Sequence, residues 1–354
     1  MDTPRLLTPS ADDSPFHPVD ATKKKGSSRP GRVGHRGLGS DCQYWRLKMI
    51  QPWNLSAIAL MSVLAMPARA GTPLQAVVYL AELQSEQIYR ISLDWDGAGT
   101  LTVSEPQFVG TAAAGGGLVA SETLIYVTGA GQVSRIDLRN GQVATVQSFN
   151  NANTCSIDPT GENLYCGWRS ALSRVPTSPF GNGTAVQLAG DDVEITGVAF
   201  TPTGDSFYST GTEAFNGDFG SLDLDTGQTM RQQAGAFATG LAWDAYTQKI
   251  LIAGLGRSRL VDPAAPAVIH SQRDDSASEN YLSLSPDGLG HAIGTRCCIA
   301  SPRLVLLDYS STGNLADPQT VIVSVPIADL TFLSGQAIFA GDRIFHSAFE
   351  EGEP

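Results

Sequence analysis

The sequence has few of the motifs on which most enzymes depend. It contains no Gly-x-Ser-x-Gly nucleophile elbow and no phosphate-binding P-loop. Beyond residue 70 its histidines are His270, His291 and His346, and their spacing does not suit a zinc site. It also lacks a Cys-x-x-Cys pair, which argues against a thioredoxin-type redox enzyme. No apolar run reaches the roughly 20 residues that span a bilayer.

Lysine is nearly missing from residues 71–354, where Lys249 is the single one. This part of the chain carries 30 acidic and 13 basic side chains. Such a surface repels phosphate backbones and anionic lipid, so we expect neither nucleic acid nor a membrane surface as a partner. The acidity is expected to keep an exported protein soluble.

A short apolar segment is followed by a processing signal. Residues 55–66 read LSAIALMSVLAM, which is too short to anchor the protein in a membrane. Ala68 and Ala70 are the small residues that signal peptidase accepts before a cleaved bond, here the bond to Gly71. We therefore predict a signal peptide over 49–70, a mature chain without a membrane anchor, and a periplasmic or secreted location.

Residues 1–48 do not belong to an ordinary signal peptide, which does not carry so long a leader. They are rich in basic residues, proline and glycine and show little periodicity. Two interpretations stay open: translation begins near Met49, or the segment is a disordered leader. In both cases it contributes nothing to the predicted fold.

From residue 74 the chain repeats with a period of roughly forty residues, which is typical of propeller blades. Each copy combines a strand, a tight turn with Pro or Gly, and a second strand. The clearest copies are 154–166, 197–209, 240–252 and 281–293. Their first strands share a small residue three places before the turn, namely Ser156, Ala199, Ala242 and Ser283. Small residues suit inner strands that crowd around a central axis, which predicts a β-propeller.

The two ends of the repeat region complement each other. The segments that match the second, third and fourth strands of a blade are 76–80, 87–93 and 101–103. Residues 329–334 look like a lone first strand. A blade made from both ends closes the ring and removes sheet edges. We predict an all-β propeller of six blades over 71–335 and a C-terminal tail over 336–354, with seven blades as the alternative if 336–349 adds strands.

A known repeat matches part of the chain. Residues 124–138, LIYVTGAGQVSRIDL, resemble the YVTN-type propeller repeat, and Ser285-Pro286-Asp287-Gly288 is the matching turn between strands. The resemblance covers most of 74–334. It implies a propeller of the lactonase-like superfamily, which includes lactonases, dehydrogenase subunits and plain binding scaffolds. It therefore implies a fold and no single activity.

The mature chain has four cysteines, an even number that indicates disulfides after export. Cys155 and Cys166 flank a hairpin turn in a register that sets them directly opposite each other. Opposed strand residues have Cα atoms about 4.5–5.5 Å apart, which suits a disulfide. Cys297 and Cys298 are adjacent, and two alternatives stay open for them: a strained vicinal disulfide or two free thiols.

One constellation of polar residues could hold a ligand. The residues six places before each turn should surround one mouth of the central channel; they are Asn153, Thr196, Thr239 and Asn280, with Asp329 on the closing strand. Loops on the same face carry Trp168, Arg169, Glu213, Asp218, Arg296 and the pair Cys297–Cys298. Oxygen ligands suit a divalent cation such as calcium. The ring is similar to the metal site of lactonase-type propellers, although no Glu falls in its register; the alternative is that it solvates the channel.

These observations leave two functional hypotheses. The first is an exported, monomeric, non-catalytic propeller that binds a protein or a small molecule, with no catalytic residue assigned. The second is a metal-dependent hydrolase of the lactonase type that uses the polar ring, where the cation would polarise a carbonyl and activate water.

Overall fold

The computed structural model describes twelve stretches of the chain. They are 71–82, 85–113, 117–129, 131–148, 154–168, 171–189, 195–210, 218–234, 237–274, 281–296, 303–323 and 333–339. All of them belong to one compact unit, Ala59–Pro354. Among these residues we find no helix of the length and apolar character that a membrane crossing requires.

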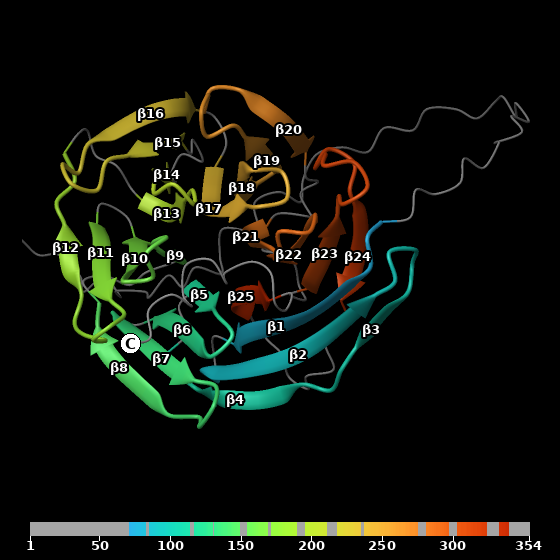
Figure 1. The fold of residues 1–354 in the computed structure, drawn as a ribbon, viewed down its shortest axis with the longest axis horizontal. Helices are drawn as coiled ribbons and strands as arrows, with labels where there is room; N and C mark the ends of the chain where they lie inside the picture. The colour runs from blue at the N-terminus through green and yellow to red at the C-terminus, as the bar shows by residue number, and fades with distance from the viewer. Residues whose placement is uncertain are drawn as a thin grey trace, which may run out of the picture. The chain divides into compact units, whose positions relative to one another are not determined.

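The described residues form twenty-five β-strands in six antiparallel sheets, which we number as blades one to six (Figure 1). Blade one contains β25 (Leu333–Phe339), β1 (Leu74–Glu82), β2 (Gln87–Trp95), β3 (Leu101–Val103) and β4 (Gln107–Thr111). Blade two contains β5 (Gly117–Ala120), β6 (Leu124–Gly129), β7 (Gln132–Asp137) and β8 (Val143–Gln147). Blade three contains β9 (Thr154–Ile157), β10 (Asn163–Trp168), β11 (Ala171–Pro176) and β12 (Thr184–Val186).

The remaining blades each have four strands in chain order. Blade four contains β13 (Ile195–Phe200), β14 (Ser206–Thr210), β15 (Asp218–Leu222) and β16 (Thr229–Ala234). Blade five contains β17 (Phe237–Asp244), β18 (Lys249–Leu255), β19 (Arg257–Val261) and β20 (Ile269–Asp274). Blade six contains β21 (Tyr281–Pro286), β22 (His291–Arg296), β23 (Arg303–Asp308) and β24 (Gln319–Val323).

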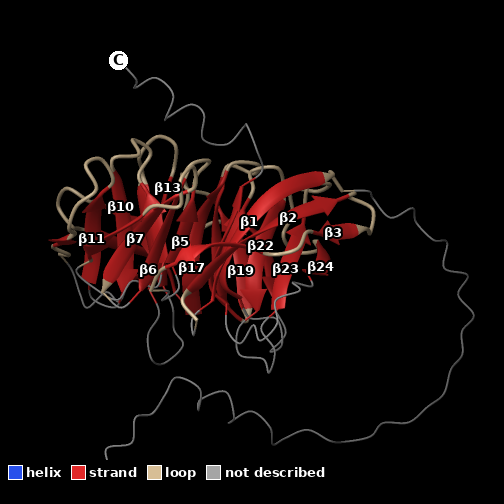
Figure 2. Ribbon diagram, turned by 90° about the horizontal axis from the view of Figure 1, so that it is seen from below, coloured by secondary structure: helices blue, strands red, loops and turns tan. Residues whose placement is uncertain are grey.

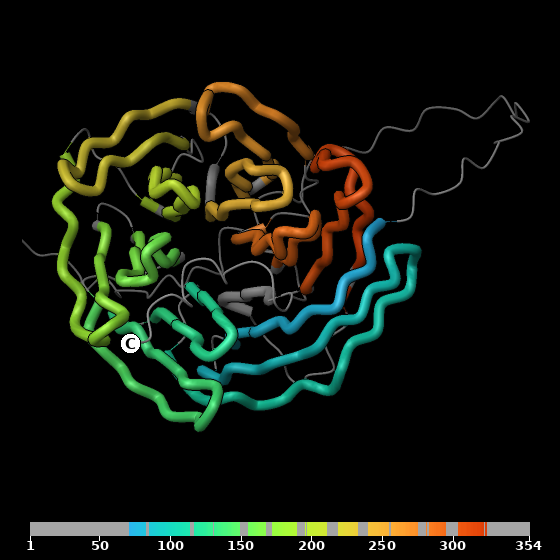
Figure 3. The backbone as a smooth tube through the Cα atoms, viewed as in Figure 1, coloured from blue at the N-terminus to red at the C-terminus, as the bar shows by residue number. Residues whose placement is uncertain are grey.

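The blades form a closed ring. The innermost strands contact one another in the order β5, β9, β13, β17, β21 and β25, and β25 contacts β5 again. Figure 3 follows the chain around this ring, and Figure 2 shows most of the described loops along one face of it. The six-bladed propeller predicted from the repeats is therefore confirmed.

The strand that closes the ring ends later in the sequence than predicted. Among the described residues it is β25, Leu333–Phe339, which overlaps the predicted segment 329–334 at residues 333–334 and runs past the predicted propeller limit at residue 335. The reason is the length of its partner, because β1 offers backbone partners as far back as Val77, which pairs with Phe339. Residues 336–339 thus complete blade one and do not start a seventh blade.

Apolar side chains fill the seams between the blades. Each seam contains one cluster of buried side chains, so six clusters surround the ring. At the seam of blades one and six, Trp95 and Leu93 pack with Leu304 and Leu306. Full burial of a side chain of this kind contributes roughly 1.5–3 kcal/mol. Burial of apolar side chains in the seams therefore holds neighbouring blades together.

The predicted disulfide joins the first two strands of blade three. Cys155 of β9 and Cys166 of β10 are bonded, and their Cα atoms are 4.2 Å apart. Leu164 pairs with Ile157 in the same hairpin. Both the bond and the register are confirmed.

Candidate ligand-binding site

Most of the predicted polar ring and its loops lie outside the described stretches. The residues concerned are Asn153, Asn280, Asp329, Arg169, Glu213, Cys297 and Cys298. Five other predicted residues lie on described strands, where the backbone fixes their places: Trp168, Thr196, Asp218, Thr239 and Arg296. The roles of all these residues stay predictions.

Thr196 and Thr239 share an unusual backbone position. Each is the extra residue of a β-bulge in an innermost strand, the first in β13 and the second in β17. In β25 the extra residue is Ser334. Bulges redirect the chain and are frequent beside functional sites. Among the described residues, no group of three or more His, Cys, Asp or Glu side chains is arranged to hold a metal ion.

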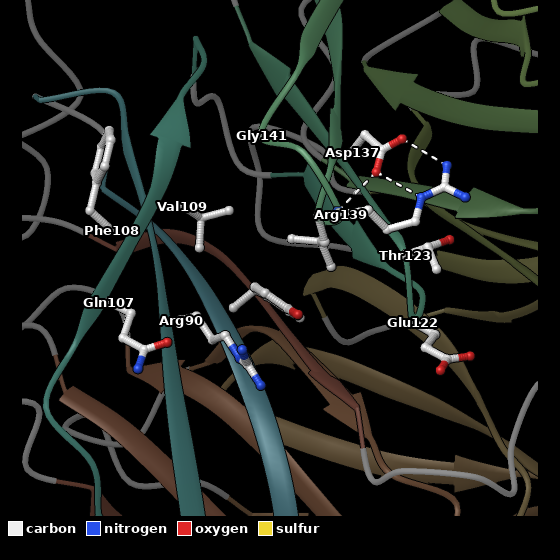
Figure 4. A pocket seen from close by; sticks show the side chains of 11 residues that line it. Arg90, Gln107, Phe108, Val109, Glu122, Thr123, Asp137, Arg139 and Gly141 are labelled. Carbon is white, nitrogen blue, oxygen red and sulfur yellow. Dashed lines mark hydrogen bonds and ion pairs between the residues drawn. The ribbon is translucent and has the colours of Figure 1, made fainter.

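A cleft of about 490 Å³ lies between blades one and two. Its first wall carries Tyr79 of β1, Arg90 of β2 and Gln107 of β4, and its second wall carries Glu122 and Thr123 from the turn before β6. Figure 4 shows Arg90 and Gln107 on one side and Glu122 and Thr123 on the other. The cleft is thus made by strands of one blade and a turn of the next.

The residues of the first wall form a row across three strands. Tyr79 pairs with Arg90, and Arg90 pairs with Gln107. Directly paired residues lie on the same face of a sheet with Cβ atoms about 4.5–5.5 Å apart. We call Tyr79, Arg90 and Gln107 the polar row. It presents a hydroxyl, a guanidinium and an amide side by side.

The side chains of the polar row have no hydrogen-bond or ion-pair partner in the part of the chain that the structure describes. The Tyr79 side chain packs in the apolar cluster between blades one and two and is 5% exposed as a whole, while the residue lines the cleft. Burial raises the pKa of Tyr79, and the charge of Arg90 acts in the opposite direction. The hydroxyl is therefore neutral and can donate a hydrogen bond.

Charges in the cleft balance. Arg139 Nη2 lies 2.7 Å from Asp137 Oδ2, and the dashed lines of Figure 4 mark this pair. Hydrogen bonds from Arg139 hold the pKa of Asp137 at about 2. Arg90 and Glu122 add one charge of each sign. Phe108 of β4 pairs with Tyr89, and its ring packs against the Tyr89 ring on the side of the sheet away from the polar row, as Figure 4 shows. A cleft with balanced charges suits an uncharged ligand with several hydroxyl groups.

The opposite flank of blade one contains a second polar cluster. His291 opens β22, and its Nδ1 lies 2.7 Å from Asp287 Oδ2. Its Nε2 lies 2.9 Å from the Thr72 carbonyl oxygen and 3.6 Å from Asp308 Oδ1. The side chains of His291 and Asp287 are completely buried. The cluster lies at the seam of blades one and six.

Asp308 connects the same cluster to blade one. Its Oδ2 accepts a hydrogen bond of 2.9 Å from Trp95 Nε1 at the end of β2. Its Oδ1 accepts bonds of 3.0 and 2.7 Å from Ser310 N and Oγ. Ser310 Oγ in turn accepts a bond of 2.6 Å from Thr72 N. We call Thr72, Trp95, Asp287, His291, Asp308 and Ser310 the clamp.

The clamp requires a protonated histidine. Both ring nitrogens of His291 face acceptors, a carboxylate and a backbone carbonyl, and only the imidazolium donates from both nitrogens. Burial lowers the pKa of His291, but the hydrogen bond and charge of Asp287 and the charge of Asp308 outweigh it and raise the pKa overall. The clamp therefore holds one cation and two carboxylates.

The clamp combines Ser, His and Asp but does not have the geometry of a nucleophilic triad. Ser310 Oγ donates to Asp308 and not to His291. His291 is also completely buried, so no substrate reaches it. A catalytic triad needs an accessible serine bonded to the histidine. The clamp is therefore a structural element that ties the ring together.

Sequence reasoning missed both groups of residues. Tyr79, Arg90 and Gln107 are far apart in the chain, and only the strand register aligns them. For the clamp a signal was present, because Asp287 and His291 are four residues apart around a tight turn. That spacing is typical of a side chain that caps its own turn.

No family model and no curated protein matches the chain. Solved structures similar to it include a 6-phosphogluconolactonase candidate from Bacteroides fragilis, at 13% identity over 71% of this chain and 83% of that chain, with a TM-score of 0.48. A streptogramin B lyase matches at 11% identity over 61% and 70%, with a TM-score of 0.45. The Swd1 propeller domain of Myceliophteria thermophila matches at 11% over 70% and 86%, also at 0.45. Similarity at this level assigns no function.

Proposed function

We propose that this chain is an exported, non-catalytic binding propeller that takes an uncharged carbohydrate in the cleft between blades one and two. The observation that carries the proposal is the polar row. Tyr79, Arg90 and Gln107 lie side by side without hydrogen-bond or ion-pair partners among the described residues, so their polar groups are available to a ligand. Export is supported by the Cys155–Cys166 disulfide together with the signal sequence.

The chemistry of the cleft favours a sugar over a charged molecule. Sugar hydroxyls both donate and accept hydrogen bonds, so they match an amide, a guanidinium and a carboxylate at once. An anion would meet Glu122 and Asp137 and the acidic surface of the mature chain, whereas an uncharged ligand meets no net repulsion.

The test is a thermal melt of the exported protein with a panel of neutral mono- and oligosaccharides. A sugar at about 100 times its dissociation constant adds about 2.7 kcal/mol of stability. Arg90→Ala should weaken the binding of that sugar roughly tenfold to a hundredfold, since a hydrogen bond to a charged group contributes about 1.5–3 kcal/mol. Arg257→Ala, at an exposed ion pair of blade five, is the matched control and should bind normally.

The proposal fails if no sugar stabilises the protein. It also fails if a sugar does bind and the Arg90→Ala protein binds it as well as the unaltered protein does. In the second case the ligand site lies elsewhere on the propeller.

A second candidate function is a metal-dependent hydrolase at the polar ring. The two bulges at Thr196 and Thr239 support it, because they occupy equivalent places in neighbouring blades. Asn153→Ala and Asn280→Ala should then abolish uptake of a divalent cation such as calcium while the melting temperature without metal stays the same. Unchanged metal content in both variants would rule this function out.

A further inference from the structure

Gly71 occupies a tight place beside the clamp. A Cβ at this residue would lie 1.9 Å from Asp308 Oδ2, so no side chain fits. On its other side, Gly97 of the turn after β2 approaches so closely that a Cβ there would lie 2.4 Å from the Gly71 carbonyl oxygen. The Gly71 amide donates a hydrogen bond of 2.7 Å to the Gly97 carbonyl oxygen. Gly71 is thus fixed between a turn of blade one and a carboxylate of blade six.

Bond geometry places the Gly71 nitrogen near that carboxylate. A nitrogen and a Cβ on the same Cα are about 2.5 Å apart, so the nitrogen lies within about 4.5 Å of Asp308 Oδ2. Trp95 Nε1 is the donor recorded to Oδ2, whereas Oδ1 receives both bonds from Ser310. A carboxylate oxygen has two lone pairs, so Oδ2 can accept one further bond.

The charges of the clamp do not balance, and Asp308 carries one of its two negative charges. His291 supplies one positive charge, and Asp287 and Asp308 supply two negative charges. A buried excess charge is costly unless a partner compensates it. The sequence independently marks Ala70–Gly71 as the bond that signal peptidase would cut.

We propose that the mature amino terminus completes the clamp: signal peptidase cuts the Ala70–Gly71 bond, and the α-ammonium group of Gly71 pairs with the Asp308 carboxylate. The hydrolysis consumes one water, leaves a carboxylate on Ala70 and frees an amino group on Gly71, which takes up a proton. The precursor has an uncharged amide there. Export and processing thereby strengthen ring closure, independently of any ligand in the cleft.

The first test is the mass of the protein exported from the full-length gene. The mature protein should begin at Gly71. A different amino terminus would overturn the proposal.

The second test moves the ammonium group away from Asp308. A serine inserted between Ala70 and Gly71 in the full-length gene leaves a mature protein with one extra residue, which displaces the charge by about 3.8 Å. The melting temperature at pH 7 should fall by roughly 2–4 °C. In an Asp308→Asn background the same insertion should have no effect, because the carboxylate is gone.

A pH series keeps the test valid if Asp308→Asn does not fold. An α-amino group has an ordinary pKa of about 7.7–8.0, and pairing raises it in the folded state. Its contribution is therefore complete below pH 7 and is lost as the pH rises past the folded value. The other charged groups near Gly71 are Asp96, Asp287, His291 and Asp308, and all are common to both proteins.

The difference in melting temperature between the two proteins should thus disappear by about pH 10.5, well above the ordinary α-amino pKa. A difference that persists at this pH, or no difference at pH 7, would overturn the proposal. Either result would mean that the insertion acts through packing or not at all.

Discussion

Blade one meets a neighbour on each flank, and the two flanks treat polar side chains in opposite ways. Toward blade six, every residue of the clamp except Thr72 is buried, and its donors find acceptors within it. Toward blade two, the polar row faces a cleft and its side chains have no hydrogen-bond or ion-pair partner in the described chain. The same β-sheet therefore contributes to a seam with a buried polar cluster and to a seam with a cleft beside its apolar cluster.

The difference teaches how to distinguish polar residues that stabilise the fold from polar residues that bind a ligand, in a chain whose sequence contains few functional motifs. A buried group that is fully paired stabilises the native state, and its removal leaves a partner unsatisfied. A polar group held in place without a partner contributes little to stability and is available to a ligand. The comparison predicts large effects of substitutions on stability at the clamp and small ones at the cleft.

The largest effect is expected for Asp287→Ala. Asp287 accepts hydrogen bonds from the backbone of Leu289 and from the backbone and ring of His291, and it is completely buried. Its removal leaves a buried imidazolium with an unmatched donor, which costs roughly 3–5 kcal/mol of unfolding free energy. Urea denaturation of the purified exported protein measures this loss.

The matched control is Asp274→Ala, at an ion pair with Arg257 in which the Asp274 side chain is 71% exposed. An exposed pair of this kind contributes about 1 kcal/mol or less. If Asp287→Ala costs no more than this control, the clamp is not the structural element described above.

A smaller loss is expected for Ser310→Ala. The hydroxyl donates to the buried Asp308 and accepts from Thr72 N, so its removal takes a donor from a buried carboxylate and an acceptor from a half-buried backbone amide. The expected cost is about 1–3 kcal/mol of unfolding free energy. Urea denaturation again measures it, and a neutral result would show that water replaces the hydroxyl.

The clamp also predicts how stability depends on pH. The pKa of His291 is raised in the folded state, so its contribution is complete below the ordinary histidine value of about 6.5 and is lost as the pH rises through the folded value. The groups that face the ring are Asp287, Asp308 and the Thr72 carbonyl.

Melting temperatures at about pH 6 and about pH 9 test this dependence, since the two values bracket the ordinary histidine pKa. The protein should be more stable at the lower pH, and His291→Gln should lose most of the difference. The His291→Gln protein keeps its amino terminus, which also loses its charge as the pH rises. The difference between the curves of the two proteins therefore reports the contribution of His291 alone. Parallel curves for the two proteins would contradict a charged His291.

The sequence predicted those features that depend on residues close to one another along the chain. The six blades followed from a repeated strand, turn and strand, and the Cys155–Cys166 bond followed from the register of one hairpin. The closing strand extends to Phe339, beyond the predicted end at residue 334, because its end depends on the length of β1, far away in the chain.

The cleft and the clamp depend on contacts between blades. Arg90 and Glu122 line one cleft only because blade two follows blade one around the ring. Likewise Trp95 and Asp308 are 213 residues apart and meet at the ring closure. No local pattern encodes such pairs, so a single sequence indicates the fold more clearly than the site.

The smallest effect on stability is expected for Tyr79→Phe, which removes one hydroxyl just as Ser310→Ala does. Tyr79 is as well buried as Ser310, at 5% and 7% exposed, but its hydroxyl has no hydrogen-bond partner among the described residues. The free energy of unfolding should change by about 0.5 kcal/mol or less, because no partner is left unsatisfied. Binding of the cleft ligand should weaken, since the ligand loses the donor that the protein leaves unused. Urea denaturation and a sugar titration on the same protein measure both quantities. If Tyr79→Phe and Ser310→Ala lower the free energy of unfolding equally, the two flanks of blade one do not differ. The polar row then gives no reason to place the binding site in the cleft.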